Sequence, residues 1–348
     1  MVNKVTLTKA LGILCVVIGH SGCPDILKNI IYLFHMPLFF FIAGYCFKDK
    51  YLNDFKTFFV HRVKGLYFPF LKWTILFILL HNLFFNLNIY NVEYGTGTGL
   101  IHYNLKTYLR LLLAALRFNT QEQLLGVFWF LKSLFFGYFI FYFFVKFFKR
   151  CFLAIGILIF IIIIILIKDV NIPFLGFRSL YPALFIMLGY LYKKIEYILP
   201  EHYSIIAIFI GVTTLIIASL FLKIEMLEVT IITFFPYTMI AFIGCITLLL
   251  LSEMLSNTYC FNNGLMAYIG SHTLGIMTLH FLSFKLVTLI LINIYGLSIK
   301  MLAAFPVITY MEPNNWWILY SFIGISCPLL LYYLCEKLLA RLHRSKIQ

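Results

Sequence analysis

Charged residues are scarce in this sequence, and acidic residues are the scarcest. Of 348 residues only 11% are charged, and 13 acidic residues stand against 27 lysines and arginines. Hydrophobic residues make up 63% of the chain and the mean hydropathy is +0.97, whereas soluble domains are about half apolar. This composition excludes a soluble fold and predicts a membrane protein.

Several catalytic and metal-binding motifs are also absent. The sequence contains no GxSxG, no Walker A and no HExxH pattern, so serine-hydrolase, P-loop and zinc-protease chemistry lose their usual support. The eight cysteines include no CxxC pair and lie mostly inside apolar runs. They read as small core residues, and neither a metal site nor a disulfide framework is predicted.

Long apolar runs occupy most of the chain. A helix needs about 20 residues to cross the ~30 Å hydrocarbon core of a bilayer. The runs lack the alternation of barrel strands, so we expect helices. We predict one all-α integral membrane domain over residues 1–348, a polytopic bundle of about ten transmembrane helices. The predicted segments are 5–22, 29–47, 65–87, 125–147, 151–167, 179–192, 203–222, 229–251, 265–295 and 316–336.

The basic residues give an orientation for this bundle. If the N-terminus is cytoplasmic, basic residues on the inner side outnumber those on the outer side roughly two to one, as the positive-inside rule requires. We therefore predict both termini inside. Because these residues are scattered over helix ends and gather on no single polar surface, nucleic acid is excluded as a partner.

Two longer segments carry further expectations. The predicted outer loop 88–124 contains a possible amphipathic helix near 105–117, and it forms either part of a substrate site or a plain connector. The segment 265–295 is long enough to be kinked or tilted.

Ionisable side chains inside the predicted spans are few, and such groups are costly in a bilayer. The first span holds Lys9 and His20 in KALGILCVVIGH. Eleven residues place them about 16 Å apart along one helix face. The second span places His35 at the same outer half as His20, so the two imidazoles are expected to converge. An imidazole there is suited to general-base catalysis; helix packing is the alternative for each.

Other candidates have equally plain structural explanations. Arg62 and Lys64 precede the third span, where they suit phosphate binding or simply set orientation. Trp129 begins the fourth span, at a position typical of an interfacial aromatic anchor. His280 is a third imidazole within a span, serving either packing or the site.

Four ordered blocks resemble the membrane acyltransferase family 3, in the branch of fucose O-acetylase-like and surface-glycan acetyltransferases. The blocks are KALGILCVVIGH, FHMPLFFFIAGYCF, FWFLKSLF and YIGSHTLGIMTLH. The family's signature of a basic residue, ten spacers and a histidine falls on Lys9 and His20. The family's pair of basic residues before the third span maps to Arg62, but the second position is Gly65, and Lys64 is the candidate substitute.

The resemblance implies an O-acyltransferase of a bacterial inner membrane. Its donor is an acyl-CoA, usually acetyl-CoA as co-substrate, and its acceptor is a hydroxyl of a surface polysaccharide or a lipid-linked glycan precursor. His20 is implied as the essential histidine, with Lys9 orienting the site and His35 beside it. Arg62 and Lys64 are expected to contact the donor, and Trp129 and His280 to support the substrate site.

Two other functions stay open from the sequence alone. One is a transporter or flippase of a lipid-linked sugar, although such a carrier would ordinarily place carboxylates in its spans. The other is a non-catalytic subunit of polysaccharide assembly. The expected partners are acyl-CoA, a carbohydrate acceptor and the lipid bilayer, and a homo-oligomer is possible.

Overall fold

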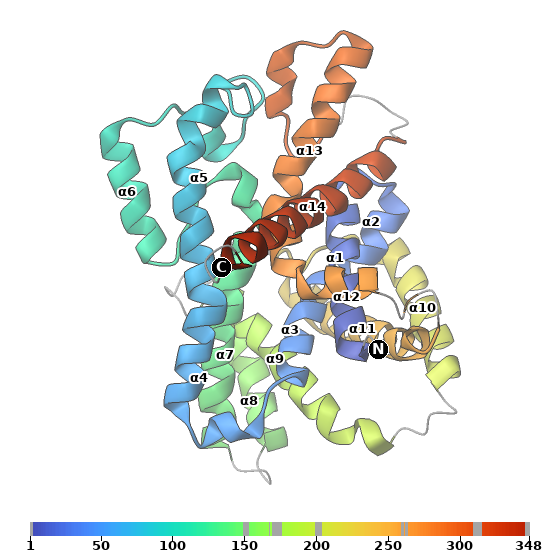
Figure 1. Ribbon diagram of the computed structural model, residues 1–348. Helices are drawn as coiled ribbons and strands as arrows, with labels where there is room; N and C mark the ends of the chain where they lie inside the picture. Colours follow the sequence, from blue (N-terminus) through green and yellow to red (C-terminus); the bar gives the residue numbers. More distant parts are fainter. Residues whose placement is uncertain are drawn as a thin grey trace.

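The computed structural model describes residues 3–148, 153–166, 168, 176–198, 204–258, 261, 264–308 and 315–344, and within these residues every regular element is a helix (Figure 1). The first half contains α1 (Lys4–His20), α2 (Asp25–Tyr32), α3 (His35–Tyr45), η1 (Asp49–Leu52), α4 (Phe55–Arg62), η2 (Val63–Tyr67), α5 (Phe68–Asn86), η3 (Gly97–Leu100), α6 (Leu105–Leu116), η4 (Gln123–Phe128) and α7 (Trp129–Phe147). The second half contains α8 (Leu153–Leu166), α9 (Phe177–Ile195), η6 (Glu196–Ile198), α10 (Ser204–Phe221), α11 (Ile231–Ser256), α12 (Gly264–Ser271), α13 (Thr273–Tyr295), η8 (Ile299–Ala303) and α14 (Trp317–Arg344).

The all-α prediction is confirmed, but the count of ten spans is not. Among the described residues, six helical stretches are long and apolar enough to cross a membrane: Asp25–Tyr45, Phe55–Asn86, Gln123–Phe147, Ile231–Ser256, Thr273–Tyr295 and Trp317–Arg341. Helices also occupy the other four predicted segments, as α1, α8, α9 and α10, but α1 and α8 have only 17 and 14 residues. Positions 151, 152, 167 and 203 of the predicted segments lie outside the described residues.

Helix ends that the predicted up-and-down order of the spans places on one side of the membrane contact one another in the structure. Lys4, at the start of α1, binds Glu196 and Glu253, each at 3.1 Å, next to the ends of α9 and α11. The Tyr45 hydroxyl, at the end of α3, donates to the same Glu196. These four ends therefore lie on one side of the bundle; which side faces the cytoplasm stays a prediction.

A second contact on that side involves Asp49, in the connection between α3 and α4. Its partial burial acts to raise its pKa, but hydrogen bonds from Lys194 and Tyr190 outweigh this effect and hold the pKa of the carboxyl below its usual range. At the opposite side, Lys300 binds Glu93 at 2.9 Å and links η8 to the loop after α5.

The predicted amphipathic helix in the long loop is confirmed as α6, which packs on α5. For 265–295 the sequence predicts either a kink or a tilt, and the structure has a break, because His272 separates α12 from α13. Two more interruptions occur: α2 and α3 break at Leu33 and Phe34, and a π-helical turn joins α4 to α5. Pro37 sits in the first turn of α3, where its missing N–H breaks no intrahelical bond.

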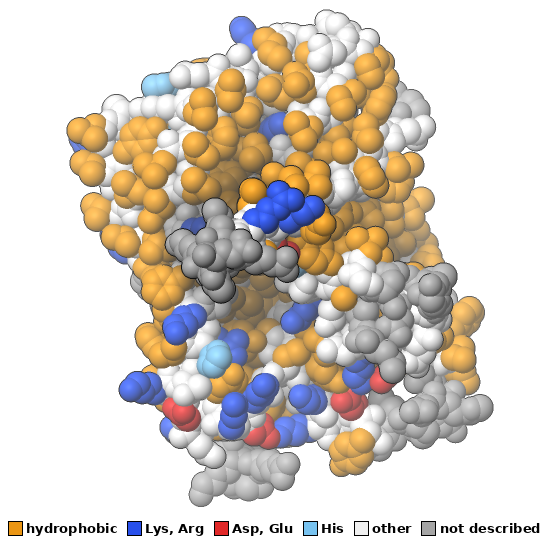
Figure 2. Space-filling view, viewed as in Figure 1, with side chains coloured by type: hydrophobic (Ala, Val, Ile, Leu, Met, Phe, Trp, Pro, Cys, Tyr) orange, Lys and Arg blue, Asp and Glu red, His pale blue; other side chains and the backbone are white. Residues whose placement is uncertain are grey.

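Apolar and charged side chains occupy different parts of the molecular surface (Figure 2). Lys, Arg, Asp and Glu gather in the lower third of this view, near α4 and the ends of α3 and α9, while hydrophobic side chains dominate the region above. The outward faces of α10 and α11 expose Phe209 by 72% and Ile232 by 87%. Such apolar faces match a lipid environment.

Helices α3 and α9 cross at two glycines. A Cβ atom at Gly44 would overlap the backbone carbonyl of Ile186, and a Cβ atom at Gly189 would overlap that of Phe41. Small residues at such crossings let membrane helices approach closely. This contact fixes α3, whose other face lines the site described below.

We expect Gly44→Ala and Gly189→Ala each to destabilise the folded protein by about 1–3 kcal/mol, because the obstructing atoms belong to backbone and the helices must separate. The measurement is the midpoint of thermal unfolding in detergent. Gly264→Ala is the control, since nothing lies within 4 Å of its Cβ position. Equal midpoints for all three variants would contradict the assignment of these glycines to a tight crossing.

Candidate active site

Helix α1 carries Lys9 and His20 on one face. Asn3 caps the helix by accepting from the Thr6 amide at 2.8 Å, and His20 is its last residue. Lys9 and His20 are separated by three turns, with Ile13 and Val16 between them on the same face. Lys9 and His20 therefore lie on one face of α1, as the sequence predicts, and no break in the helix separates them.

His20 pairs with His280 of α13, from the far end of the chain. His20 Nδ1 lies 3.3 Å from His280 Nε2, and the two rings stack at 5.4 Å between centroids and 20° between planes. His280 is fully buried, whereas His20 is half-buried. The ring of Phe281 packs against His20 at 5.1 Å.

The hydrogen bonds assign a tautomer to this pair. His280 Nδ1 lies 2.8 Å from the carbonyl of Met277 and 3.2 Å from that of Ile276. Carbonyls only accept, so Nδ1 carries the proton in a neutral His280, and its Nε2 accepts from His20 Nδ1. His20 Nε2 then keeps its lone pair, and it has no hydrogen-bond partner among the described residues.

His35 lies beside this pair but is not paired with it. It is 3% exposed, and its Nδ1 donates to the Ile31 carbonyl at 2.9 Å. Tyr32 connects the two sites: its hydroxyl donates to the Gly19 carbonyl at 3.1 Å, and its ring lies 5.0 Å from the ring of His35. Tyr32 therefore contacts both His35 and the backbone of Gly19, which precedes His20. The direct hydrogen-bond partner of His20 is His280.

A cavity of about 410 Å³ extends from the other end of the α1 face. Lys9 and Arg62 both line it, together with Cys46 and Tyr138. The cations come from α1 and α4, which are distant in sequence. The structure therefore brings two of the predicted basic residues to one site.

Arg62 is held in this cavity by aromatic rings. Its guanidinium carbon lies 3.8 Å from the ring centroid of Tyr138 and 5.5 Å from that of Phe58, close enough for cation–π attraction. Its Nε atom is buried and has no hydrogen-bond partner among the described residues. A buried charged donor without an acceptor is costly, which makes Arg62 suited to an anionic ligand.

Lys64 lies elsewhere. It is exposed on the π-helical turn and is not part of the lining, whereas Gly65 lines the cavity and has no atom within 4 Å of its Cβ position. The position at which the family pattern has a basic residue thus faces the cavity, and glycine leaves it open. The role of Lys64 in donor binding stays a prediction.

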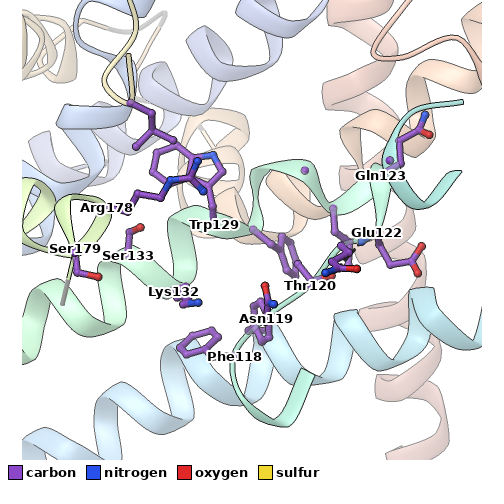
Figure 3. A pocket seen from close by; sticks show the side chains of 18 of the residues that line it. Phe118, Asn119, Thr120, Glu122, Gln123, Trp129, Lys132, Ser133, Arg178 and Ser179 are labelled. Carbon is purple, nitrogen blue, oxygen red and sulfur yellow. Dashed lines mark hydrogen bonds between the residues drawn. The ribbon is translucent and has the colours of Figure 1, made fainter. Parts of the chain in front are cut away.

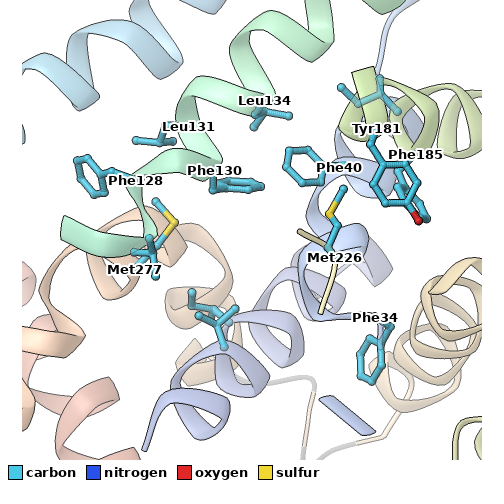
Figure 4. Close-up of a cluster of buried hydrophobic side chains, with 14 of the residues drawn as sticks. Phe34, Phe40, Phe128, Phe130, Leu131, Leu134, Tyr181, Phe185, Met226 and Met277 are labelled. Atoms are coloured by element: carbon cyan, nitrogen blue, oxygen red, sulfur yellow. The ribbon is translucent and has the colours of Figure 1, made fainter. Parts of the chain in front are cut away.

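Apolar side chains form the wall between the basic end of the cavity and the histidines. Figure 4 shows Phe130, Leu131 and Leu134 of α7 and Met277 of α13, all of which line the cavity. Val16, one turn before His20, and Met277, three residues before His280, belong to the same lining. The cavity therefore ends about one helical turn short of the histidine pair.

A second, larger cavity of about 950 Å³, here called the chamber, lies on the other side of η4. Trp129 lines it at the start of α7 with Lys132 one turn on, and Arg178 and Ser179 line it from the start of α9 (Figure 3). The predicted substrate-site residue Trp129 thus faces a chamber, although it lies apart from the cavity that holds Lys9 and Arg62.

A buried carboxylate network beside the chamber was not anticipated from the sequence. The carboxylate of Glu122, a lining residue, lies 3.0 Å from His81 Nδ1 and accepts from Tyr103 at 2.7 Å and from Tyr90 at 3.3 Å. His81 Nε2 donates to the Ile101 carbonyl at 2.8 Å. An imidazole in the middle of the apolar run ILLHNLFF was the available signal, because a buried polar group requires a partner.

Comparison with known proteins identifies a family. A family model described as an acyltransferase domain, the acyltransferase family 3 model, matches residues 2–333, nearly the whole chain. No curated protein and no solved structure matches the chain.

Proposed function

Because this chain belongs to membrane acyltransferase family 3, we propose that it transfers an acetyl group from cytosolic acetyl-CoA to a hydroxyl of a surface polysaccharide or of its lipid-linked precursor, in a bacterial plasma membrane. One observation carries the proposal. An imidazole with a free Nε2 lone pair lies beyond the end of a cavity whose other end holds Lys9 and the unpartnered Nε of Arg62.

The basic end of the cavity suits the donor. Guanidinium and ammonium groups bind the phosphates of coenzyme A, and the apolar wall of α7 and α13 suits its uncharged arm. The cavity volume of about 410 Å³ is enough for that arm and the acetyl group. The thioester is thereby directed along α1 toward His20.

His20 acts as the general base in this proposal. Its Nε2 takes the proton of the acceptor hydroxyl while the oxygen attacks the thioester carbonyl. The C–O bond forms, the C–S bond breaks, and coenzyme A leaves as a thiolate that takes up a proton. His280 holds His20 in the required tautomer, so it is a positioning residue and does not contact the reacting atoms.

The test is transfer of label from radiolabelled acetyl-CoA into the glycan fraction of host membranes that contain or lack the protein. Protein-dependent, alkali-labile label in glycan supports O-acetyl transfer. Absence of label together with loss of surface glycan would instead indicate a transporter or flippase. Absence of label with an unimpaired surface glycan, and no binding of acetyl-CoA, would indicate a non-catalytic subunit.

Arg62 and Lys64, which lie two positions apart, provide a matched test of the donor site. We expect Arg62→Gln to raise the KM for acetyl-CoA about tenfold or more, since a charge-assisted bond to phosphate contributes about 1.5–3 kcal/mol. Lys64→Gln removes the same charge outside the cavity, and we expect it to change KM less than about twofold. Equal effects of the two variants would show that only the net charge of this segment matters.

A further inference from the structure

A buried lysine in α13 lies outside both the histidine pair and the cavity of Lys9 and Arg62. Lys285 is 4% exposed, and its Nζ donates to the backbone carbonyl of Ala304 at 2.7 Å. No carboxylate of the described residues forms an ion pair with it. An ionisable side chain within a span is costly to bury, so a specific role for the bond to Ala304 is expected.

The carbonyl that Lys285 binds belongs to a segment held from three sides. Asn91, in the loop after α5, donates its side-chain amide to the Lys300 carbonyl at 2.6 Å. Gln123, at the start of η4, donates to the Ala303 carbonyl at 3.3 Å. With Lys285, three buried donors from distant parts of the chain therefore fix η8 and the residue that follows it.

Phe305 comes directly after this anchored segment and forms part of a wall. Its ring lines the chamber and packs on the ring of Phe281 at 4.7 Å. Phe281 packs in turn on His20 at 5.1 Å and on His280 at 4.0 Å. A Cβ atom at Gly126 would lie 3.6 Å from Phe305 and 3.9 Å from Phe281, so the backbone of η4 borders both rings. Two aromatic rings therefore stand between the chamber and the histidine pair.

Water is a competing acceptor for a general base of this kind. The Nε2 lone pair of His20 can take a proton from water as it does from a sugar hydroxyl. The water oxygen then attacks the thioester carbonyl, the C–O bond forms, the C–S bond breaks, and the products are acetate and coenzyme A. Asn119, Thr120 and Ser133 give the chamber a polar lining, and its volume of about 950 Å³ admits many water molecules. Transfer to a sugar therefore requires that this water be kept from His20.

We propose that the rings of Phe305 and Phe281 keep water from His20. Lys285 is the positioning residue of this wall, because its bond to the Ala304 carbonyl holds Phe305 in place. A saccharide bound in the chamber makes enough contacts to displace the ring of Phe305, whereas a single water molecule does not. The inference rests on the proposed function, which it deepens by stating how the site distinguishes a sugar hydroxyl from water.

The ratio of acetyl transfer to acetyl-CoA hydrolysis measures how well the wall excludes water, and it does not depend on the amount of folded protein. The assay uses purified full-length protein, radiolabelled acetyl-CoA and the host glycan fraction. Lys285→Met removes the donor and keeps an unbranched side chain, and we expect it to lower the ratio about tenfold, the factor that one buried hydrogen bond contributes. Phe305→Ala opens the wall directly and should lower the ratio at least as much. Lys300→Gln removes an exposed lysine from the same segment and should keep the wild-type ratio.

The effects of the two substitutions should not add, because Lys285 acts through Phe305 in this proposal. We expect the double variant Lys285→Met/Phe305→Ala to have the ratio of Phe305→Ala alone, within about twofold. Effects that multiply would show that Lys285 acts elsewhere. A wild-type ratio in Phe305→Ala would overturn the wall itself.

A second measurement needs no acetyl transfer. Diethyl pyrocarbonate, which reacts with an imidazole nitrogen that has a free lone pair, is added to the purified protein without acetyl-CoA. Mass spectrometry then follows the modification of His20 relative to that of His61, which is exposed on α4. We expect Lys285→Met and Phe305→Ala each to raise the relative rate at His20 about tenfold. Equal relative rates in the wild type and both variants would overturn the proposal.

The wall and the reaction fail in different ways. Faster modification of His20 in the two variants, without acetyl transfer by the wild type, would support the wall and contradict the reaction. Acetyl transfer by the wild type, with the ratio and the reactivity of His20 unchanged in the variants, would support the reaction and contradict the wall.

Discussion

His20→Ala is expected to lower acetyl transfer by about 10²–10⁴-fold, the range over which general-base catalysis contributes to enzymatic rates. The loss should appear in kcat, because His20 lies beyond the cavity that holds Lys9 and Arg62 and so makes little contribution to donor binding. The measurement is initial-rate transfer from acetyl-CoA in membranes with matched amounts of protein.

Two further variants separate chemistry from packing at this position. His20→Gln nearly preserves the size of the side chain but has no basic nitrogen, so we expect a loss as large as that of His20→Ala. His35→Ala should lose much less activity, because the ring of His35 is bound to the Ile31 carbonyl and packs on Tyr32, and no hydrogen bond joins it to His20 among the described residues. Wild-type rates in both His20 variants would exclude a base at this position.

His280→Phe is expected to lower kcat by about 10²-fold, since it removes the acceptor that fixes the His20 tautomer while keeping a ring in the same space. His280 has no exposed surface and lines neither cavity. The KM for acetyl-CoA should therefore stay within about twofold of the wild-type value.

The conservative replacement His280→Gln distinguishes tautomer control from a structural role. A glutamine side-chain oxygen can accept from His20 Nδ1, so we expect His280→Gln to recover most of the activity that His280→Phe loses. Both variants should unfold at similar temperatures in detergent. A loss of activity that follows thermal stability and ignores the acceptor would identify His280 as a packing residue.

The sequence predicted those parts of the site that depend on one helix. Helical spacing is enough to place Lys9 and His20 on one face, because the geometry of α1 is local. The confirmed amphipathic helix α6 and the break at His272 are local features too. Composition was enough to predict the all-helical membrane fold.

The remaining parts depend on how distant helices pack. The spacing of residues in one helix says nothing about its neighbour, so the pairing of His20 with a residue 260 positions away was not predictable. Arg62 and Lys64 look equivalent in sequence, yet the π-helical turn after Arg62 alters the helical rotation and only Arg62 lines the cavity. Glu122 was assigned to a loop, and it is buried because the chain between α5 and α7 folds back over His81.

The segment η4 has a cavity on each side. Val127 lines the cavity of Lys9 and Arg62, whereas Leu125, Gly126 and Phe128 line the chamber. The predicted orientation places the two cavities on opposite sides of the bilayer. In that orientation this short segment also blocks the leakage of ions across the membrane. In the proposed reaction acetyl groups pass this segment while protons and ions do not, because the membrane potential of the whole cell would act across it.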